Sequence, residues 1–397
     1  MSLEDGPLSG LRVLEFGQLL AGPYVGTLLS DFGADVVKIE APGAGDAMRD
    51  WGRLRHNDRS LWWSILARNK RSVTLNLKTK EGVAALKRMV KKADVVVENY
   101  RPDVKRRLGI DYKDLAKINK KIVYASISGF GQTGPYADRP GFDQIAQGMG
   151  GLMSITGVPG QGPMRAGIAI ADLTAGLFAA LGILTALLER EKSGKGQHVT
   201  TSLLQAQIFM LDFQSARWLI GNEVPGQAGN NHPTSAPTGV YKTSDGYINI
   251  ATTGGKMWER MCAALGKPQW AKSAEYATAP ERLKRRDQLN GEIEAVTVTR
   301  TSADWVEALN EAGVPCGPIY NIDQVFADPQ VKHLKVAQTI KGKQRAVTMA
   351  QQPMSLSRTP SKLVKQAPAL GEHTAAVLKE FGFSKKQIAD LAKAGAI

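Results

Sequence analysis

Short apolar segments alternate with amphipathic ones over the first 130 residues, and this alternation most constrains the fold. Between the apolar segments the hydrophobic positions follow the period of a helix. Strands that are apolar on both faces are typical of a parallel sheet covered by helices on both sides. The pattern predicts an open, doubly wound α/β domain, in which ligands bind at the carboxyl ends of the strands. The predicted strands lie at residues 11–16, 34–40, 71–77, 94–100 and 121–131.

Residues 206–329 show a different pattern. A polar linker containing Gly and Pro precedes a hairpin pattern with Asp245 and Gly246 at its turn, and helical patterns follow. The 397 residues exceed what one hydrophobic core usually supports. We therefore expect a smaller α+β domain over 206–329 and a larger domain made from 1–205 and 330–397.

The longest apolar run spans 173–188, contains two glycines and is followed directly by charged residues. It is too short to cross a bilayer and indicates a buried helix. Asp172 stands at its start and is the only charged residue between Arg165 and Glu189. A carboxylate there either caps the helix or, in a nearly dry cleft, serves as a nucleophile.

The formal net charge of +14, from 51 basic and 37 acidic residues, raises the question of a nucleic-acid partner. The basic residues are spread along the chain, as in "KRMVKKAD" and "PERLKRRD", without a helix-turn-helix, zinc-finger or aromatic RNA-binding signature. A polyanionic small molecule is therefore the better expectation. Neither Cys262 nor Cys316 lies in a CxxC motif, and the five histidines are scattered. We expect no metal, no disulfide, no membrane span and a cytoplasmic location.

The first two predicted strands also suggest a dinucleotide-binding fold as an alternative. Gly17 follows the first strand and Glu40 ends the second, as in folds that bind a ribose through an acidic residue. However, the turn reads "GQLLAGP" and lacks the middle glycine of GxGxxG. An NAD-dependent dehydrogenase is therefore not favoured.

Several segments together resemble the class III CoA-transferase (CaiB/BaiF) family, in order and from Leu8 to the C-terminus. They include "GLRVLEFGQLLAGPYVGTLLSDFGADVVKIEAPGAGDAMR", "NKRSVTLNLKTKEG", "ADVVVENYRP", "SISGFGQTGPYADRPGFDQIAQGMGGLMSITG", "AIADLTAGLFAALGILTALLEREKSGKGQ" and "LGEHT". The resemblance implies a large Rossmann-like domain that includes the C-terminal tail, a smaller middle domain and an interlocked homodimer. It also implies transfer of coenzyme A from an acyl-CoA to a carboxylic acid.

The resemblance assigns Asp172 as the catalytic carboxylate, which carries the acyl group as a mixed anhydride and then CoA as a thioester. Gln18 and the turn at Gly254 and Gly255 are the candidate donors to the oxyanion. Two further groups of residues are implied in CoA binding. They are Gln18, Leu20 and Ala21 at the pantetheine end, and Leu75, Asn99, Tyr100 and Arg107 near the adenine and phosphates, with Arg49 as a further phosphate candidate.

The acceptor acid is suggested by where the sequence matches, and where it differs from, particular members of the family. Formyl-CoA transferase has an arginine at the position of Ala41, a lysine near Pro140 and a long glycine loop that has no counterpart here, so an oxalate-specific enzyme is not favoured. The chain is more similar to the succinyl-CoA-dependent dicarboxylate branch. Arg165 is a candidate to meet the distal carboxylate of a dicarboxylic acid, and His232 a candidate for the acyl pocket.

Two alternatives stay open at this point. The α-methylacyl-CoA racemases of the same family use a His–Asp pair, but the position of that histidine holds Phe142, which cannot exchange a proton. A non-catalytic CoA-binding protein is the other alternative, because a fold and its binding residues can persist without the chemistry.

Overall fold

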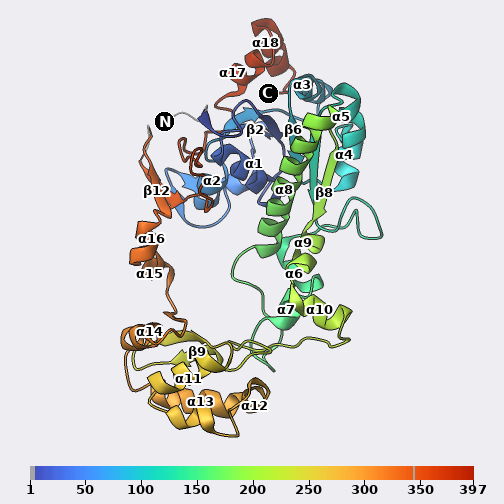
Figure 1. Ribbon diagram of the computed structural model, residues 1–397. Helices are drawn as coiled ribbons and strands as arrows, with labels where there is room; N and C mark the ends of the chain where they lie inside the picture. The colour runs from blue at the N-terminus through green and yellow to red at the C-terminus, as the bar shows by residue number, and fades with distance from the viewer. Residues whose placement is uncertain (1–4, 343–344) are drawn as a thin grey trace. The chain divides into compact units, whose positions relative to one another are not determined.

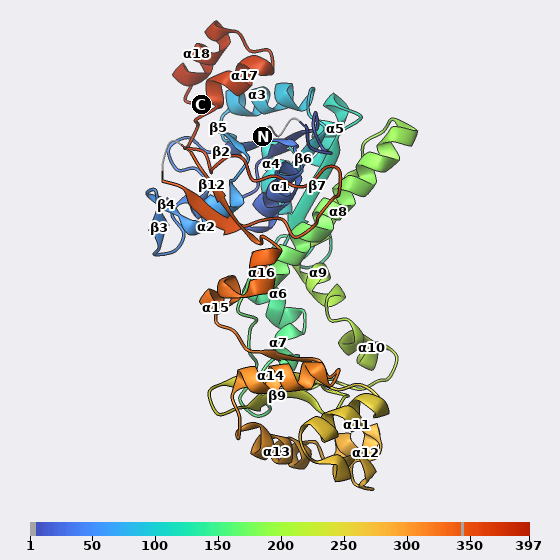
Figure 2. The ribbon, with the colours of Figure 1, turned by 60° about the vertical axis from the view of Figure 1, so that its left-hand side comes forward.

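The protein, a computed structural model that describes residues 5–342 and 345–397, divides into two compact units (Figures 1 and 2). The first unit extends from the N-terminal part to Leu152 and also contains Arg165–Ala216 and Lys332–Ile397. The second unit contains Met153–Met164 and Arg217–Val331. The C-terminal segment thus packs with the N-terminal part of the chain.

A six-stranded parallel sheet forms the centre of the first unit, with its strands in the order β5-β2-β1-β6-β7-β8. This is the strand order of the Rossmann fold, and it reverses direction between β1 and β6. The predicted parallel α/β sheet is therefore confirmed. The strands are β1 (Arg12–Glu15), β2 (Asp35–Glu40), β5 (Arg71–Thr74), β6 (Val95–Glu98), β7 (Val123–Ser128) and β8 (His198–Ser202).

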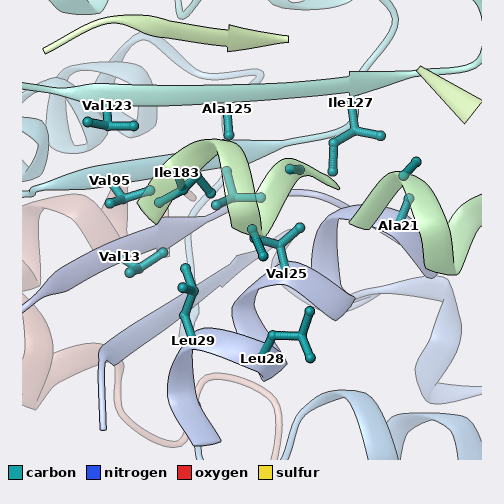
Figure 3. Close-up of a cluster of buried hydrophobic side chains, with 14 of the residues drawn as sticks. Val13, Ala21, Val25, Leu28, Leu29, Val95, Val123, Ala125, Ile127 and Ile183 are labelled. Carbon is teal, nitrogen blue, oxygen red and sulfur yellow. The ribbon is translucent and has the colours of Figure 1, made fainter. Parts of the chain in front are cut away.

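The alternation of side chains along each strand places a hydrophobic core on both faces of this sheet. On one face, Val13 and Val95 pack with α1 (Ala21–Asp31) and α8 (Ile170–Ser193), as Figure 3 shows. On the other face, the next residues along the strands pack with α3 (Lys80–Val90), α5 (Tyr112–Ile118) and α17 (Thr374–Glu380). Covering both faces leaves the carboxyl ends of the strands as the natural place for a ligand.

The other elements of the first unit are short. They are η2 (Ala47–Arg49), β3 (Arg55–His56), β4 (Arg59–Ser60), α2 (Leu61–Leu66), α4 (Pro102–Leu108), α6 (Asp143–Met149), α9 (Leu203–Phe209), β12 (Ala337–Ile340), β13 (Val347–Ala350) and α18 (Lys385–Lys393). Boundaries between the two units fall within three of the described helices, namely α7 (Leu152–Ile155), α10 (Phe213–Leu219) and α16 (Pro329–His333).

Helix α8 is longer than the apolar run from which it was predicted. Its 24 residues are long and apolar enough to cross a membrane by length and composition, so the expectation that it is too short was wrong. Half of its most apolar window is buried inside the protein, and it packs against α1, β7 and β8. The helix is therefore a core helix of the first unit, as the sequence indicated, and not a membrane span.

The second unit contains a small antiparallel sheet in the order β11-β10-β9. The predicted hairpin is present, with Asp245 and Gly246 between β9 (Thr238–Lys242) and β10 (Tyr247–Ala251). Helices cover one face around buried Trp258 and Trp305. The remaining elements are α11 (Gly255–Ala264), η3 (Pro268–Lys272), α12 (Ala279–Lys284), α13 (Arg286–Thr297), α14 (Ser302–Glu311), β11 (Cys316–Pro318) and α15 (Ile322–Ala327).

Candidate active site

A cavity of about 300 Å³ lies at the carboxyl ends of the sheet strands in the first unit. It lies where the strand order reverses between β1 and β6, which is the usual ligand position in doubly wound sheets. Its volume is at the lower end for a small-molecule site and suits the reactive end of a ligand. Six of the predicted site residues line it, namely Gln18, Leu20, Ala21, Asn99, Tyr100 and Asp172.

Gln18 comes from the turn between β1 and α1, and its side chain is exposed. The backbone of Gln18 is held by Asn99, which follows β6. The Gln18 N–H donates to Asn99 Oδ1 over 2.7 Å, and Asn99 Nδ2 donates to the Gln18 carbonyl over 2.8 Å. The next residue, Leu19, has a φ of +62°, a left-handed conformation that is uncommon for a branched side chain.

Tyr100 is held on the other side of the cavity by a buried acidic residue. Its N–H donates to Glu98 Oε2 over 2.8 Å, and Lys105 Nζ lies 2.5 Å from the other oxygen of Glu98. The Tyr100 ring stacks on Phe16 with the ring centres 6.0 Å apart. Burial raises the pKa of Tyr100 to about 12, so the phenol is neutral at physiological pH.

Asp172 is the third residue of α8, whereas Ala169 occupies the N-cap position without a side-chain cap. The interpretation of Asp172 as the N-cap was therefore wrong. A residue of α6 supplies the cap instead, because the Ala171 N–H donates to Asp143 Oδ1 over 2.8 Å. Within residues 5–342 and 345–397, no hydrogen bond or ion pair engages the Asp172 carboxylate. Asp172 is therefore free to react with a molecule in the cavity.

Burial and, to a smaller extent, the nearby negative charge of Asp143 together raise the pKa of Asp172 from 3.8 to about 7. The positive end of the helix dipole favours the ionised form of a carboxylate in the first turn. Desolvation opposes that effect, and the pKa of Asp172 is raised on balance. A raised pKa also makes the ionised carboxylate a stronger base and a better nucleophile than an ordinary one.

Asp143 and Gln147, one turn apart on α6, hold the segment that leads into α8. Gln147 is fully buried, accepts the Ala166 N–H over 2.8 Å and donates to Asp143 over 2.6 Å. Arg165 Nη2 lies 3.9 Å from Asp143 Oδ2, with nearly half of the Arg165 side chain exposed. Arg165 is thus tethered near this segment, but it does not line the cavity.

Three of the predicted CoA-binding residues lie outside the cavity lining. The Arg49 guanidinium makes two 2.7 Å bonds to Glu40 and stacks on the Trp63 ring at 3.8 Å. Leu75 is buried in the core on the α3 face of the sheet. Arg107 is exposed on α4. Among these, only Arg107 offers its guanidinium to a ligand without first leaving an internal partner.

The remaining predicted site residues belong to the second unit. Gly255 is the first residue of α11, and Gly254, with a φ of +79°, is its N-cap. His232 lines a separate cavity of about 680 Å³ together with residues of β9 and β10. Their roles toward an oxyanion and an acyl group stay predictions. No cluster of three or more His, Cys, Asp or Glu side chains suited to a metal occurs in the described parts of the chain.

Sequence reasoning missed the side chains beneath the cavity, above all Lys38, Asp46 and Asp143. Lys38 carried a signal, because a charged residue in the middle of the apolar strand "DVVKIE" requires buried partners. Lys38 Nζ lies 2.8 Å from Glu15 and 2.7 Å from Asp46, and all three side chains are almost fully buried. Asp143 carried no such signal, since acidic residues are common in the first turn of a helix.

The model of CoA-transferase family III matches residues 8–374 of the chain. The succinate–glutarate CoA-transferase of Agrobacterium fabrum is 40% identical over 381 residues, which cover 94% of this chain and 95% of the relative. The succinyl-CoA–D-citramalate CoA-transferase of Chloroflexus aurantiacus is 38% identical over 391 residues, covering 97% of this chain and 96% of the relative.

Among solved structures, that of a CAIB/BAIF family protein from Brucella suis is similar, with a TM-score of 0.86 and 38% identity. The similarity covers 95% of this chain and the whole of that one. The likeness therefore includes both units and the C-terminal segment.

Proposed function

This chain belongs to CoA-transferase family III, and we propose that it carries CoA from succinyl-CoA to a dicarboxylic acid through covalent intermediates on Asp172. As a class III CoA-transferase it moves CoA between an acyl-CoA and a carboxylic acid. The observation that carries the proposed mechanism is the position of Asp172. Its carboxylate has no internal partner in the described chain and opens on the cavity at the switch point of the sheet.

The proposed reaction needs no ATP, because each bond that breaks is replaced by one of similar energy. The Asp172 carboxylate attacks the thioester carbonyl of the donor and expels CoA thiolate, leaving an acyl-aspartyl anhydride. The thiolate then attacks the aspartyl carbonyl and releases the donor acid as a carboxylate, leaving an aspartyl-CoA thioester. The acceptor carboxylate repeats these steps in reverse order and leaves as its CoA ester, which restores Asp172.

Each step passes through an oxyanion that requires fixed hydrogen-bond donors. Gln18 is suited to this role because its backbone is fixed by Asn99 and its side chain is exposed at the cavity. In other acyl-transfer enzymes the loss of one such donor costs about 3 to 4 kcal/mol of activation free energy. Phe142 lines the same cavity and has no exchangeable proton, which favours transfer over the racemase chemistry.

The names of the two relatives support succinyl-CoA as the donor and a dicarboxylic acid as the acceptor. A dicarboxylic acid needs a cation for the carboxylate that does not react. Arg165 is suited to this role, because its exposed guanidinium is tethered only at 3.9 Å to Asp143. A planar guanidinium binds a carboxylate through two parallel hydrogen bonds.

We also propose that two copies pair as an interlocked homodimer in the cytoplasm. The exposed side of α8 carries Leu177, Leu181, Leu184 and Leu188, which form a continuous apolar stripe at helical spacing. Such a stripe is unusual on a monomer and suits a second copy of the same surface. Both cysteines are free, which supports a reducing compartment.

The test incubates purified protein with succinyl-CoA and a panel of mono- and dicarboxylic acids, oxalate included, without ATP. Mass spectrometry of the CoA thioesters then identifies the acceptor. Borohydride added during turnover should convert the aspartyl thioester to homoserine at position 172. We expect a dicarboxyl-CoA product and the modified peptide in the wild type only.

The control pairs Asp172→Ala with Asp287→Asn, which changes an exposed acidic residue in the first turn of α13. We expect Asp172→Ala to abolish transfer and Asp287→Asn to leave it unchanged. Normal transfer by Asp172→Ala would contradict the mechanism. Entry of solvent deuterium at an acyl α-carbon without thioester exchange would instead favour the racemase.

A further inference from the structure

The turn after β1 carries Gln18 into the cavity, yet it has no regular secondary structure to hold it. Residues 16–20 link the end of β1 to the start of α1, and within them Leu19 adopts a left-handed backbone conformation. Such a conformation persists only where the surroundings enforce it. The side chains that hold Leu19 in this conformation therefore help to form the site.

Asn99 is the central side chain of this support. It accepts the N–H of Gln18 and donates to the carbonyl of the same residue, so one amide satisfies both backbone groups. Gly17 and Gly22 allow this approach, because a Cβ at Gly17 would lie 2.7 Å from Asn99 Oδ1. The resemblance implied that Asn99 contacts CoA, but in the structure its amide is engaged by the protein itself.

Buried charges secure the residues on either side of Gln18. Lys38 Nζ donates to the carbonyl of Gly17, and Asp46 Oδ1 accepts the N–H of Leu19 over 3.1 Å. Lys38 and Asp46 are themselves paired at 2.7 Å, and each is almost fully buried. The polar backbone groups along this turn are thus held by side chains from β2, from the segment after it and from the end of β6.

We propose that Asn99 is a positioning residue for acyl transfer, whose amide fixes the Gln18 backbone so that Gln18 and Asp172 face the cavity in a constant geometry. The inference rests on the proposed function, because it gives Gln18 a role toward the oxyanion. A group that must meet a developing charge is most effective when it needs no reorganisation. Asn99 follows β6 at the switch point, and its amide bonds the turn after β1. It therefore fixes the ends of these two strands relative to each other.

The experiment compares Asn99→Ala, Asn99→Asp and the control Asn119→Ala. Asn119 also donates to two backbone carbonyls, those of Val90 and Ala93, but it does so at the amino end of β7, away from the cavity. Steady-state kinetics measure kcat and the KM for succinyl-CoA, and hydrogen exchange measures the protection of the peptide that contains Gln18 and Leu19.

We expect Asn99→Ala to lower kcat at least about tenfold while the KM for succinyl-CoA changes less than about threefold. Exchange at the Gln18 peptide should become faster in the same variant. Asn99→Asp keeps the acceptor but loses the donated bond, so its kcat should lie between those of Asn99→Ala and the wild type. Asn119→Ala should alter neither kcat nor the exchange of this peptide.

A loss confined to the KM for succinyl-CoA would overturn the proposal, because it would make Asn99 a direct CoA contact. An unchanged kcat, or unchanged exchange at the Gln18 peptide, would overturn it as well. The exchange measurement does not depend on turnover. It therefore separates failure of this inference from failure of the proposed function, which an inactive wild type would reveal.

Discussion

Ionisation of Asp172 is expected to oppose folding, and Asp172→Asn tests this directly. In the unfolded chain the carboxyl has an ordinary pKa near 3.8, whereas burial and Asp143 raise the folded value to about 7. The folded state therefore binds the proton more tightly than the unfolded state. Stability conferred by that proton is present at low pH and is lost as pH rises from the lower value to the higher one.

The difference between the two pKa values corresponds to about 4 kcal/mol of folding free energy above pH 7, as an upper limit. About 1.5 kcal/mol of this is already lost at pH 5, since the unfolded carboxyl is ionised there. Asparagine does not ionise, so the stability of Asp172→Asn relative to wild type should rise by up to about 3 kcal/mol between pH 5 and pH 8.5.

The assay is urea unfolding followed by far-ultraviolet circular dichroism at both pH values. Asp287→Asn, on the surface of the second unit, should keep a constant difference from wild type, within about 0.5 kcal/mol. A difference between Asp172→Asn and wild type that stays flat across this pH range would refute the reasoning. It would mean that Asp172 ionises near its ordinary pKa in the folded protein.

The same ionisation should govern the rate of the first chemical step. Only about one tenth of Asp172 is ionised at pH 6, compared with about nine tenths at pH 8. Single-turnover acylation by succinyl-CoA should therefore be about tenfold faster at pH 8 than at pH 6. The acceptor is absent from this experiment, so its own titration does not contribute. A rate that is constant over this range would contradict the raised pKa.

Three further substitutions probe the surroundings of the site. Asp143→Asn keeps an oxygen that caps α8 but removes the negative charge near Asp172. The pKa of Asp172 should therefore fall, and the rise of the single-turnover acylation rate with pH should move to lower pH. Lys38→Met leaves the buried Asp46 carboxylate without its cation and leaves Glu15 with Lys70 alone, so it should lower the unfolding free energy by about 3 to 5 kcal/mol, measured by urea unfolding. Arg49→Ala should destabilise the fold, because Glu40 and Trp63 already engage the Arg49 guanidinium. The KM for succinyl-CoA should then change less than about twofold. A large increase in that KM would instead support a contact between Arg49 and a phosphate of CoA.

Much of the fold was predictable because it is encoded locally. Each of the first five strands of the sheet is an apolar segment with a helical pattern beside it, and the structure contains all five. The sixth strand, β8, was missed because "HVTTS" is polar and lies at the edge of the sheet, where one side needs no partner strand. The family resemblance, now confirmed, rested on long stretches of residues in a fixed order and not on any single motif.

The site was predictable only where one residue carried an unusual signal. Asp172 was conspicuous as a lone charge beside an apolar helix, and the resemblance assigned it the chemistry. Its N-cap role was misjudged because the true cap, Asp143, comes from α6 and lies 28 residues before Ala171, whose N–H it accepts. The raised pKa of Asp172 could not be predicted either, since it depends on how closely α6 packs on the start of α8.

The buried charges follow from the geometry of the sheet. Where the strand order reverses, successive helices leave to opposite faces and do not cover the strand ends between them. The space that admits a ligand therefore also leaves backbone groups of Gly17, Gln18 and Leu19, in the turn after β1, without helical partners. Asn99, Lys38 and Asp46 satisfy those groups, and the left-handed turn at Leu19 results. Two features of this crevice, the left-handed backbone of Leu19 and the ionised carboxylate of Asp172, therefore oppose folding, so substitutions that relieve either one should stabilise the protein and slow the transfer.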